Sequence, residues 1–509
     1  MDFLDPHKRR VRKIELMIGY VLITILLGLG TLVLLYLSYG FGLGKNGQII
    51  QNGLVFISST PSSANIYVSG VQKGTTNARV ILPSGQYLLQ LQRSGYRVWS
   101  RAFNVDGGSV QHFDYPFLIP SKLTSKNSAI FASSPQLVLQ SPNRRWLLVE
   151  QPGVIGEFYE FDLTHIAAAP IVVNIPPSLI TPNTSPTQGL SLVQWSTDNQ
   201  HVILARTTAS GVEYILFDRQ TPSDSVDLNT ALSLSSTLTA SLPPTSRPDA
   251  IQFWNNNYNQ YYLYDASTLT LSTATLSDPT PQTVLTGVQS YTPYGSNLIL
   301  YADGINAPAS EAAVRLRDSG TTYNLTDLPS GSQYLLDLAQ NNGNWYYAIG
   351  ASNDSKVYVY ENPEQNLQNQ PDLPIVPVTI LNVPQPDYVD FSADTQMILA
   401  ESGTQFRVYD DFTNKVYDYN LSIPLDTPQK HATWMNGEQL TLVSGGKLVI
   451  FDYDDANQQT LNPASAEAGS YFDTNYKYVY TIAPNTDSAT DATNPYALTN
   501  TALRTPADL

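Results

Sequence analysis

The chain lacks cysteine altogether and holds few charged side chains. Its 509 residues include no Cys, and Asp, Glu, Lys and Arg together make up 14%. The missing cysteine excludes disulfide bonds, thiolate metal sites, a cysteine nucleophile and a lipidated N-terminal cysteine. A domain of this size outside the cytoplasm must then be held by its core alone, which fits a bacterial source better than a eukaryotic secretory one.

One apolar segment, residues 14–39, stands apart from the rest of the chain. No charged residue occurs between Glu15 and Lys45. About 20 apolar residues, at a rise of 1.5 Å each, cross the hydrocarbon core of a membrane. The segment is too long for the core of a signal peptide, and no small-x-small cleavage motif follows it. We therefore expect a permanent, single-pass transmembrane helix at residues 14–39.

The residues before this segment are strongly basic and predict its orientation. The five basic side chains of the tail are Lys8, Arg9, Arg10, Arg12 and Lys13. The positive-inside rule places such a tail in the cytoplasm. We expect residues 1–13 to be cytoplasmic and everything after the helix to lie outside the cell membrane.

The part of the chain after residue 13 is acidic. It holds 22 Lys and Arg against 41 Asp and Glu, a net charge of −19. A field of this sign repels nucleic acids and anionic head groups. We expect no nucleic-acid partner, and we expect the lipid bilayer to be a partner only through the helix.

A small domain follows a Gly-rich stalk at residues 40–52. Residues 53–118 contain short strand-like runs separated by Gly, Pro and Ser turns, which is typical of a small β-sandwich. The expected strands are Leu54–Ser58, Asn65–Val68, Ala78–Leu82, Tyr87–Gln92, Arg101–Val105 and Val110–Tyr115.

The same residues resemble the PEGA domain, a bacterial extracytoplasmic β-sandwich. The shared text includes Gly53–Pro61, Ala64–Val68 and Leu82–Tyr87, with turn residues at Pro61, Gly70, Gly74, Pro83, Gly85 and Gly95. The chain differs at the Pro-Glu-Gly-Ala motif that names the family, because Pro61–Ala64 reads Pro-Ser-Ser-Ala. Without a glycine at Ser63, we expect that turn to avoid positive φ. The resemblance implies a binding or spacer module without catalysis.

Residues 125–484 carry a repeat of about 42 to 56 residues. Seven apolar-rich strands each end in an acid, and the seven acids are Asp162, Asp218, Asp265, Asp318, Glu361, Asp410 and Asp452. Such periods indicate the blades of a β-propeller. A partial eighth unit follows Ala466, so we predict seven or eight blades, with a closing strand from near Phe117 or Phe131. The degraded Ser-Pro-Asn and Ser-Thr-Asp turns resemble those of TolB-like and WD40-like propellers.

The fold class predicted is therefore an all-β ectodomain, a PEGA-like β-sandwich plus a propeller, on one N-terminal transmembrane helix. We expect the strand-closing acids to cap turns by accepting backbone N–H bonds. The polar, aperiodic residues 485–509 predict a disordered tail.

The sequence indicates no catalytic residue, metal site or cofactor. None of the five histidines (His7, His112, His165, His201 and His431) pairs with another at ligand spacing, and no nucleophile elbow or phosphate loop occurs. Asp452–Asn457 lacks the glycine and distal Glu of a calcium loop and is read as a turn. A propeller axis could still gather a carboxylate pair for glycoside hydrolysis, with Glu150, Glu213 and Glu401 as strand-borne candidates.

Aromatic residues are the stronger functional lead, with 32 Tyr and 6 Trp. Aromatic faces beside amides suit sugar rings or peptides. Trp195 and Trp434 occupy equivalent positions ahead of a polar turn, so a core role competes with a binding role. The sequence identifies no ligand-binding residue.

We therefore predict a membrane-anchored, extracytoplasmic binding or scaffold protein of the bacterial cell envelope. Its propeller would recognise an envelope polysaccharide, a protein or another cell surface. The alternatives are an envelope glycan hydrolase with carboxylates at the propeller axis, and an accessory subunit of a secretion or pilus machine.

Overall fold

A computed structural model describes residues 6–38, 41–43, 49–165, 168–182, 189–236, 238, 250–305, 307–308, 310–331, 333–369, 375–427, 429, 431–485 and 495–508. The chain divides into two compact units. One comprises Met1–Lys122 together with Thr505–Asp508, and the other comprises Leu123–Arg504. Each unit is described by itself below.

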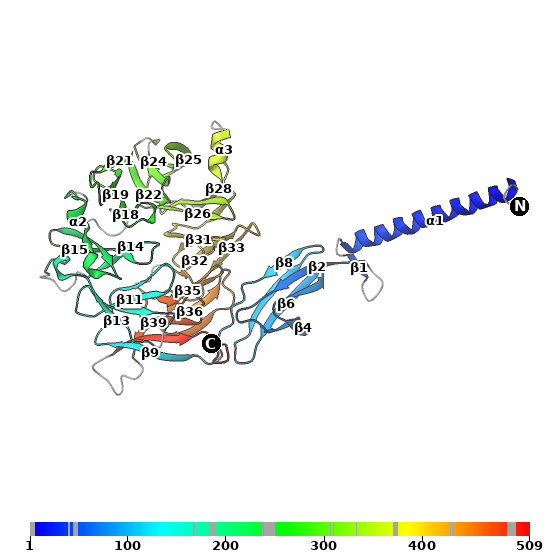
Figure 1. Cartoon of the computed structure of the whole chain (residues 1–509), viewed down its shortest axis with the longest axis horizontal. Coiled ribbons are helices and arrows are strands. Elements are labelled where there is room, and N and C mark those ends of the chain that lie inside the picture. Colours follow the sequence, from blue (N-terminus) through cyan, green and yellow to red (C-terminus); the bar gives the residue numbers. More distant parts are fainter. Residues whose placement is uncertain are drawn as a thin grey trace. The chain divides into compact units, whose positions relative to one another are not determined.

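The first unit begins with helix α1 (Pro6–Ser38), drawn in blue in Figure 1. Its segment Val11–Tyr36 has a mean hydropathy of 2.5 and is long and apolar enough to cross a membrane. The two Thr hydroxyls inside this segment are satisfied by the helix, since Thr24 and Thr31 each donate to the carbonyl four residues earlier at 2.8 Å. The helix starts before residue 14, so the basic residues predicted to set orientation belong to its first turns.

The rest of the first unit is a β-sandwich, as predicted (Figure 1). Its two sheets are β4-β3-β6-β7 and β1-β2-β5, and β8 pairs in parallel with β2. The strands are β1 (Phe41–Leu43), β2 (Ile49–Ile57), β3 (Asn65–Val68), β4 (Val71–Thr75), β5 (Ala78–Pro83), β6 (Gly85–Gln92), β7 (Trp99–Val105) and β8 (Val110–Phe113). Val55, Ile57, Leu89, Leu91 and Trp99 lie buried in a shared core between the sheets.

Two turns of the sandwich need the left-handed backbone region. Gly70 and Gly95 have φ angles of +80° and +82°, which glycine adopts without a steric penalty. Ser63 has a φ of +66°, so the expectation that its turn avoids positive φ is wrong. The turn keeps its geometry because the Ala64 N–H donates to Thr76 Oγ1 at 3.0 Å and Thr76 in turn hydrogen-bonds Ser59 Oγ at 2.8 Å.

We expect Ser63→Gly to stabilise the sandwich. A left-handed conformation costs a non-glycine residue about 1–2 kcal/mol, and part of that gain is offset by the larger entropy of glycine in the unfolded chain. Amide hydrogen exchange of β2 and β6 in the full chain should slow several-fold. The control is Ser62→Gly, where φ is not positive, and it should exchange faster than the native chain. Equal exchange in both variants would contradict this account of the turn.

The C-terminal residues Thr505–Asp508 are part of the first unit. The Thr505 N–H donates to Tyr96 Oη at 3.0 Å, and the Tyr96 hydroxyl donates to Asp508 Oδ2 at 2.7 Å. Arg93 forms an ion pair with Asp508. The chain therefore returns to the sandwich after it has built the second unit.

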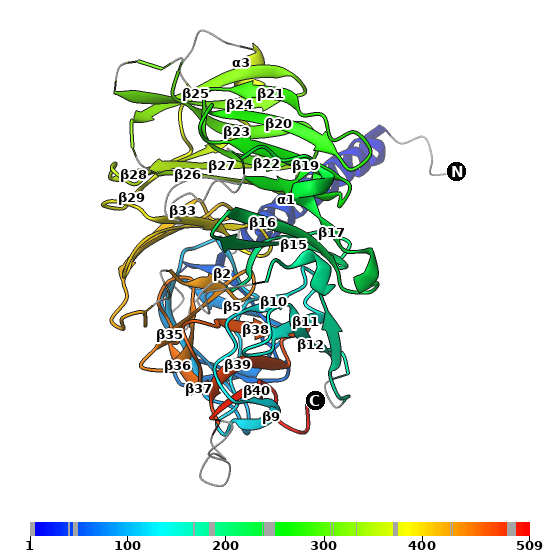
Figure 2. The ribbon, with the colours of Figure 1, turned by 90° about the vertical axis from the view of Figure 1, so that its left-hand side faces the viewer.

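The described residues of the second unit form eight four-stranded antiparallel sheets, numbered one to eight here in chain order (Figure 2). Sheets one to four are β10 (Val138–Gln140), β11 (Trp146–Glu150), β12 (Glu157–Asp162), β13 (Ile171–Asn174); β14 (Ser191–Trp195), β15 (His201–Thr208), β16 (Gly211–Asp218), β17 (Val226–Asp227); β18 (Ile251–Phe253), β19 (Gln260–Asp265), β20 (Thr270–Thr275), β21 (Gln282–Thr286); and β22 (Val288–Tyr294), β23 (Leu298–Asp303), β24 (Glu311–Asp318), β25 (Thr321–Pro329).

Sheets five to eight repeat this order, except that β9 completes the last one. They are β26 (Tyr334–Asn341), β27 (Asn344–Ala351), β28 (Lys356–Glu361), β29 (Thr379–Asn382); β30 (Tyr388–Phe391), β31 (Met397–Ser402), β32 (Gln405–Asp410), β33 (Lys415–Asn420); β34 (Thr433–Trp434), β35 (Gln439–Ser444), β36 (Lys447–Asp452), β37 (Gln459–Pro463); and β38 (Ser470–Phe472), β39 (Tyr478–Pro484), β40 (Tyr496–Ala502), β9 (Thr124–Phe131). Short helices α2 (Leu228–Ala231) and α3 (Pro363–Asn369) lie in connections.

The propeller is closed by pairing the two ends of its own chain. Strand β9 runs antiparallel to β40, from Phe131 opposite Tyr496 to Thr124 opposite Ala502. The prediction of seven or eight blades resolves to eight, and the closing strand is the one that ends at Phe131. The predicted disordered tail at 485–509 is wrong for β40, whose Ala497, Leu498 and Thr501 are fully buried.

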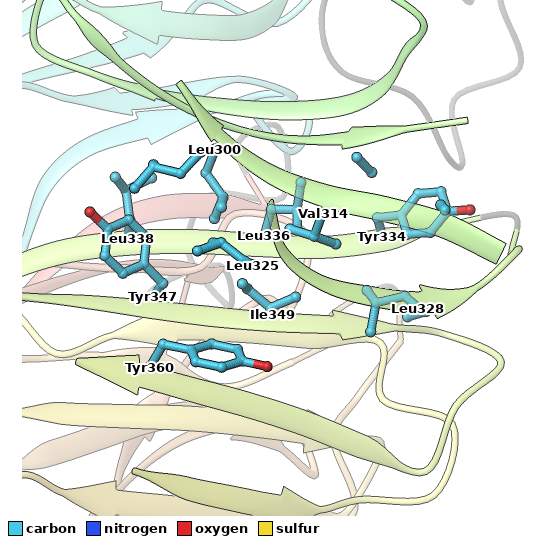
Figure 3. Packing of buried hydrophobic residues seen from close by; sticks show 14 of the residues in the cluster. Leu300, Val314, Leu325, Leu328, Tyr334, Leu336, Leu338, Tyr347, Ile349 and Tyr360 are labelled. Carbon is cyan, nitrogen blue, oxygen red and sulfur yellow. The ribbon is translucent and has the colours of Figure 1, made fainter. Parts of the chain in front are cut away.

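Neighbouring sheets pack through apolar side chains. Figure 3 shows one such core, where Leu300 and Val314 of sheet four meet Leu336, Tyr347 and Ile349 of sheet five. Burying a side chain of this size contributes about 1.5–3 kcal/mol. Similar cores join sheets one and two, two and three, three and four, five and six, and eight and one.

Four of the seven strand-closing acids cap turns, as predicted. Asp162, Asp218, Asp265 and Asp410 each accept a backbone N–H two residues ahead, at 2.8 to 3.1 Å. Six of the seven acids close the third strand of a sheet, whereas Asp265 closes the second strand of sheet three. In four sheets, a side chain at the start of the second strand donates a hydrogen bond to the strand-closing acid of that sheet. The four donors are Arg145, Gln200, Gln396 and Gln439. This bond repeats the internal geometry of a blade.

Candidate functional site: the axial strands and a cavity beside them

The first strand of each sheet lies at the propeller axis. First strands of consecutive sheets contact one another, as β14 contacts β18 and β26 contacts both β22 and β30. Each first strand pairs with only one neighbour in its own sheet, so its other edge carries backbone groups without ladder partners.

Polar side chains on these strands satisfy the free edge of a neighbouring sheet. Gln194 Oε1 accepts from the Phe253 N–H, Thr292 Oγ1 donates to the Leu336 carbonyl, and Gln140 Nε2 donates to the Phe472 carbonyl, all at 2.7 Å. An unpaired buried backbone group costs about 1–3 kcal/mol, so these bonds hold the axis together.

Two carboxylates on the first strands of sheets five and six, Asp337 on β26 and Asp390 on β30, lie near enough to interact electrostatically. Asp337 Oδ1 accepts from the Leu338 N–H at 2.9 Å. Burial, followed by the charge of Asp390, raises the pKa of Asp337 to about 7. Burial raises the pKa of Asp390 to about 6, although the Tyr388 hydroxyl donates to it at 2.9 Å. Near neutral pH the pair therefore holds a proton that two exposed carboxylates would have released.

Tyr388 links this pair to a cavity on the next sheets. Its ring stacks on His431, with centroids 3.6 Å apart and planes 3° from parallel. His431 lines a cavity of about 490 Å³ between sheets seven and eight. The polar and aromatic lining includes Gln140, Arg144, Thr433, Trp434 and Tyr471.

The cavity has an aliphatic wall, and its lining also carries the charged residues Arg144 and Glu467. Leu442, Val443, Leu448 and Ala468 form part of the lining. The Trp434 Nε1–H is buried and has no hydrogen-bond partner in the described part of the chain. Arg144 stacks on Tyr476 at 4.8 Å but forms no ion pair with any described residue. The volume falls within the range of about 300–1,000 Å³ typical of small-ligand sites.

The acids named from the sequence are not brought together. Glu150 accepts from the Gly156 N–H at 3.1 Å, Glu213 pairs with the buried Arg206 at 3.3 Å, and Glu401 accepts from the Ala432 N–H at 3.1 Å. These three acids belong to sheets one, two and six, and each has a structural partner. The acids that do meet, Asp337 and Asp390, have no motif around them. Only an alignment of the eight first strands would have revealed polar residues at the axis.

His201 and the Asp452 segment have local partners. His201 stacks on Tyr258 at 3.8 Å and hydrogen-bonds Asp198, while Asp452 accepts from Gln439 and Asn457. Within the described ranges, no cluster of three or more His, Asp or Glu side chains has the arrangement of a metal site.

Comparison with known proteins gives a match for the sandwich and distant likenesses for the propeller. No curated protein sequence matches the chain. The Dos1 propeller is 10% identical, with a TM-score of 0.43, and covers 75% of this chain and 95% of its own. An uncharacterized protein from Listeria monocytogenes EGD-e is 12% identical, with a TM-score of 0.37 over 68% of this chain and 93% of its own. Dihydro-heme d1 dehydrogenase NirN in complex with DHE is 14% identical, with a TM-score of 0.37 over 66% of this chain and 67% of its own. Residues 52–119 match the family model of the PEGA domain, so the sandwich is a PEGA domain.

Proposed function

We propose that this chain is a membrane-anchored binding and scaffold protein of the bacterial cell envelope. Helix α1 holds it in the cell membrane with its N-terminus in the cytoplasm, and the PEGA domain and propeller work outside. The observation that carries the proposal is the contrast at the axis. Three of its polar side chains are bonded to backbone groups of a neighbouring sheet, whereas the 490 Å³ cavity beside it is lined by aromatic, charged and aliphatic side chains.

The charge of the two units favours a neutral partner for the propeller. Residues 123–504 hold 15 Lys and Arg against 37 Asp and Glu, a net charge of −22. Residues 52–119, in contrast, hold five Lys and Arg against two Asp and Glu. A propeller of this charge repels polyanions at long range, and the repulsion weakens with salt. Neutral glycans or proteins therefore fit the propeller better than teichoic-acid-like polymers.

A glycan hydrolase remains the second candidate because of Asp337 and Asp390. Adjacent carboxyl groups whose pKa values are raised to about 7 and about 6 resemble an acid and base pair. Asp337 accepts from the Leu338 N–H and Asp390 accepts from the Tyr388 hydroxyl, which gives both acids a structural role, so binding without hydrolysis is the function we favour.

The experiment is a pull-down with the full-length chain in nanodiscs of neutral lipid. The discs are incubated with solubilised bacterial cell-wall glycan, and retained polymer is measured by intact mass. We expect retention of polymer of unchanged length, with empty nanodiscs as the control. Shortened polymer that disappears in an Asp337→Asn, Asp390→Asn double variant would establish the hydrolase instead. Retention of a protein alone would favour the accessory-subunit role, and retention of nothing would overturn the proposal.

A further inference from the structure

We propose that one end of sheet four binds a short peptide by both of its charged termini. The peptide carboxylate lies against Arg317 in a hollow between sheets three and four, and the ammonium group lies against Asp318 in a hollow between sheets four and five. This site is separate from the axial strands and from the 490 Å³ cavity. It adds a ligand to the proposed function and does not depend on it.

The two hollows share a rim at this end of sheet four. The hollow between sheets three and four has a volume of about 400 Å³, and the hollow between sheets four and five has a volume of about 230 Å³. Both are lined by Ser296, Asn297 and Ser319, which belong to the β22–β23 and β24–β25 turns. The Ser319 N–H donates to the Asn297 carbonyl at 3.1 Å, which joins the two turns. A ligand in one hollow can therefore extend over this rim into the other.

Arg317 and Asp318 bring opposite charges to the two hollows. They are consecutive residues of β24, and successive side chains of a strand point to opposite faces of its sheet. Arg317 lines the hollow toward sheet three, and Asp318 lines the hollow toward sheet five. Asp318 Oδ1 accepts from the Ser319 hydroxyl at 3.0 Å, but neither charged residue forms an ion pair with any described residue. Both charges are therefore available to a ligand.

The hollow around Arg317 suits a carboxylate. A guanidinium offers N–H donors in a planar fork that matches the two oxygens of a carboxylate. Burial raises the pKa of Tyr262 to about 12, and the charge of Arg317 opposes that rise, so the guanidinium lies near this ring. Thr273 adds a hydroxyl, while Val284 and Ile299 add an apolar wall for a side chain. The net charge of −22 on the propeller repels polyanions, which favours a ligand with a single negative charge here.

The hollow around Asp318 suits an ammonium group. Glu364 adds a second carboxyl group to this lining and accepts from the Tyr347 hydroxyl at 3.3 Å. The rings of Tyr294 and Trp345 stand at 90° to each other, with centroids 4.8 Å apart. The faces of aromatic rings attract a cation, and an adjacent carboxylate adds to that attraction. The second hollow therefore selects the opposite terminus from the first.

The spacing of the hollows sets the length of the ligand. Packed sheets lie about 10 Å apart, so the hollows on the two sides of sheet four have centres about 10 Å apart. Three extended residues span about the same length, roughly 10 Å. The Asn297 amide and the Ser296 and Ser319 hydroxyls line both hollows, where they can pair with the peptide groups of such a chain. A neutral sugar has no charge to match either end, so the arrangement favours a tripeptide.

The test is calorimetric titration of the full-length chain in neutral nanodiscs with the tripeptide leucyl-alanyl-leucine. We expect saturable binding. The C-terminal amide and the N-acetyl form of this peptide each lack one terminal charge and should bind about tenfold more weakly, the effect of losing one charge-assisted hydrogen bond. The dipeptide leucyl-leucine is too short to reach both hollows and should also bind about tenfold more weakly.

Two variants assign each terminus to its hollow. Arg317→Gln should bind the tripeptide and its C-terminal amide equally, because the group that recognises the carboxylate is gone, and it should still discriminate against the N-acetyl form. Asp318→Asn should show the reverse pattern. The matched controls are Lys415→Gln and Asp327→Asn, which remove exposed charges on β33 and β25 that line neither hollow. Both controls should bind and discriminate as the native chain does.

A second readout keeps the proposal testable if a variant folds poorly. In the native chain, the tripeptide should slow amide hydrogen exchange at Asn297 and Ser319 and leave β34 unchanged.

The site is overturned by the absence of saturable binding up to roughly 10 mM, a concentration at which even weak sites fill. Equal binding of the amide and N-acetyl forms, or native discrimination by both variants, also overturns it. Protection of the same rim by the neutral sugar cellotriose, with none by the tripeptide, would assign the hollows to a glycan instead. The glycan pull-down is a separate measurement, so the proposed function and this site can fail independently.

Discussion

A chain that ends at residue 495 should fail to close its propeller. This truncation removes β40, and with it the buried Ala497, Leu498, Thr501 and Leu503. It also leaves β9 and β39 without their shared partner. Loss of one buried leucine costs about 2–5 kcal/mol, so losing the whole strand exceeds the margin by which most domains are stable. We expect the propeller of the truncated chain to be unfolded or to melt more than about 10 °C below that of the native chain. Calorimetry in detergent, with helix α1 kept in both chains, measures the two melting temperatures.

The matched control is a chain that ends at Arg504. It keeps β40 and loses only the residues that bond to Tyr96 and Arg93. Its propeller should melt at the native temperature. A chain ending at residue 495 that melts like this control would show that the last strand is dispensable and that closure has been misassigned.

Raising the pH from about 5 to about 9 should destabilise the propeller. Burial raises the pKa of Glu401 to about 9, of Glu150 to about 7 and of Asp337 to about 7. In the unfolded chain these groups lose their protons near pH 4. Above that pH the folded state therefore holds protons that the unfolded state has released. The free energy of unfolding falls as pH rises, by up to about 1.4 kcal/mol per unit for each group, until the folded pKa is passed.

Glu401→Gln tests the largest of these shifts. Glutamine keeps an oxygen that can accept from the Ala432 N–H but carries no ionisable group. We expect urea denaturation at pH 5 to give similar stability for both chains, and at pH 9 to favour the variant by several kcal/mol. Glu311→Gln, at an exposed position, is the control and should follow the native curve. A native stability that rises between pH 5 and pH 9 would refute the assignment of these buried acids.

The local patterns of the sequence were sufficient for the strands and the repeat. Alternation and turn residues placed six sandwich strands within a few residues of their observed bounds, and the closing acids gave seven of the eight sheets. The exception is instructive. Sheet three was counted from Asp265, which ends its second strand, because an apolar run closed by an acid looks the same on either strand.

Features that depend on distant pairing could not be predicted. Strand β40 is rich in Ala, Thr and Asn, and its partner β9 begins with five polar residues, so neither has a hydrophobic signal of its own. The axial pair Asp337 and Asp390 arises from two strands 53 positions apart, and the Trp434 cavity depends on how sheets seven and eight meet. Ser63 shows the same limit at short range, because hydrogen bonds to Thr76 hold a turn that its own residue type disfavours.

The double connection between the two units has a mechanical consequence. The chain passes from the first unit into the propeller at Leu123, immediately before β9, and it returns after Arg504, immediately after β40. A tension applied along the chain between helix α1 and the propeller enters the propeller at β9. The covalent route loads β9, and the hydrogen-bonded route through Asp508 loads β40. The same ladder closes the ring, so a tension that separated β9 from β40 would open the propeller.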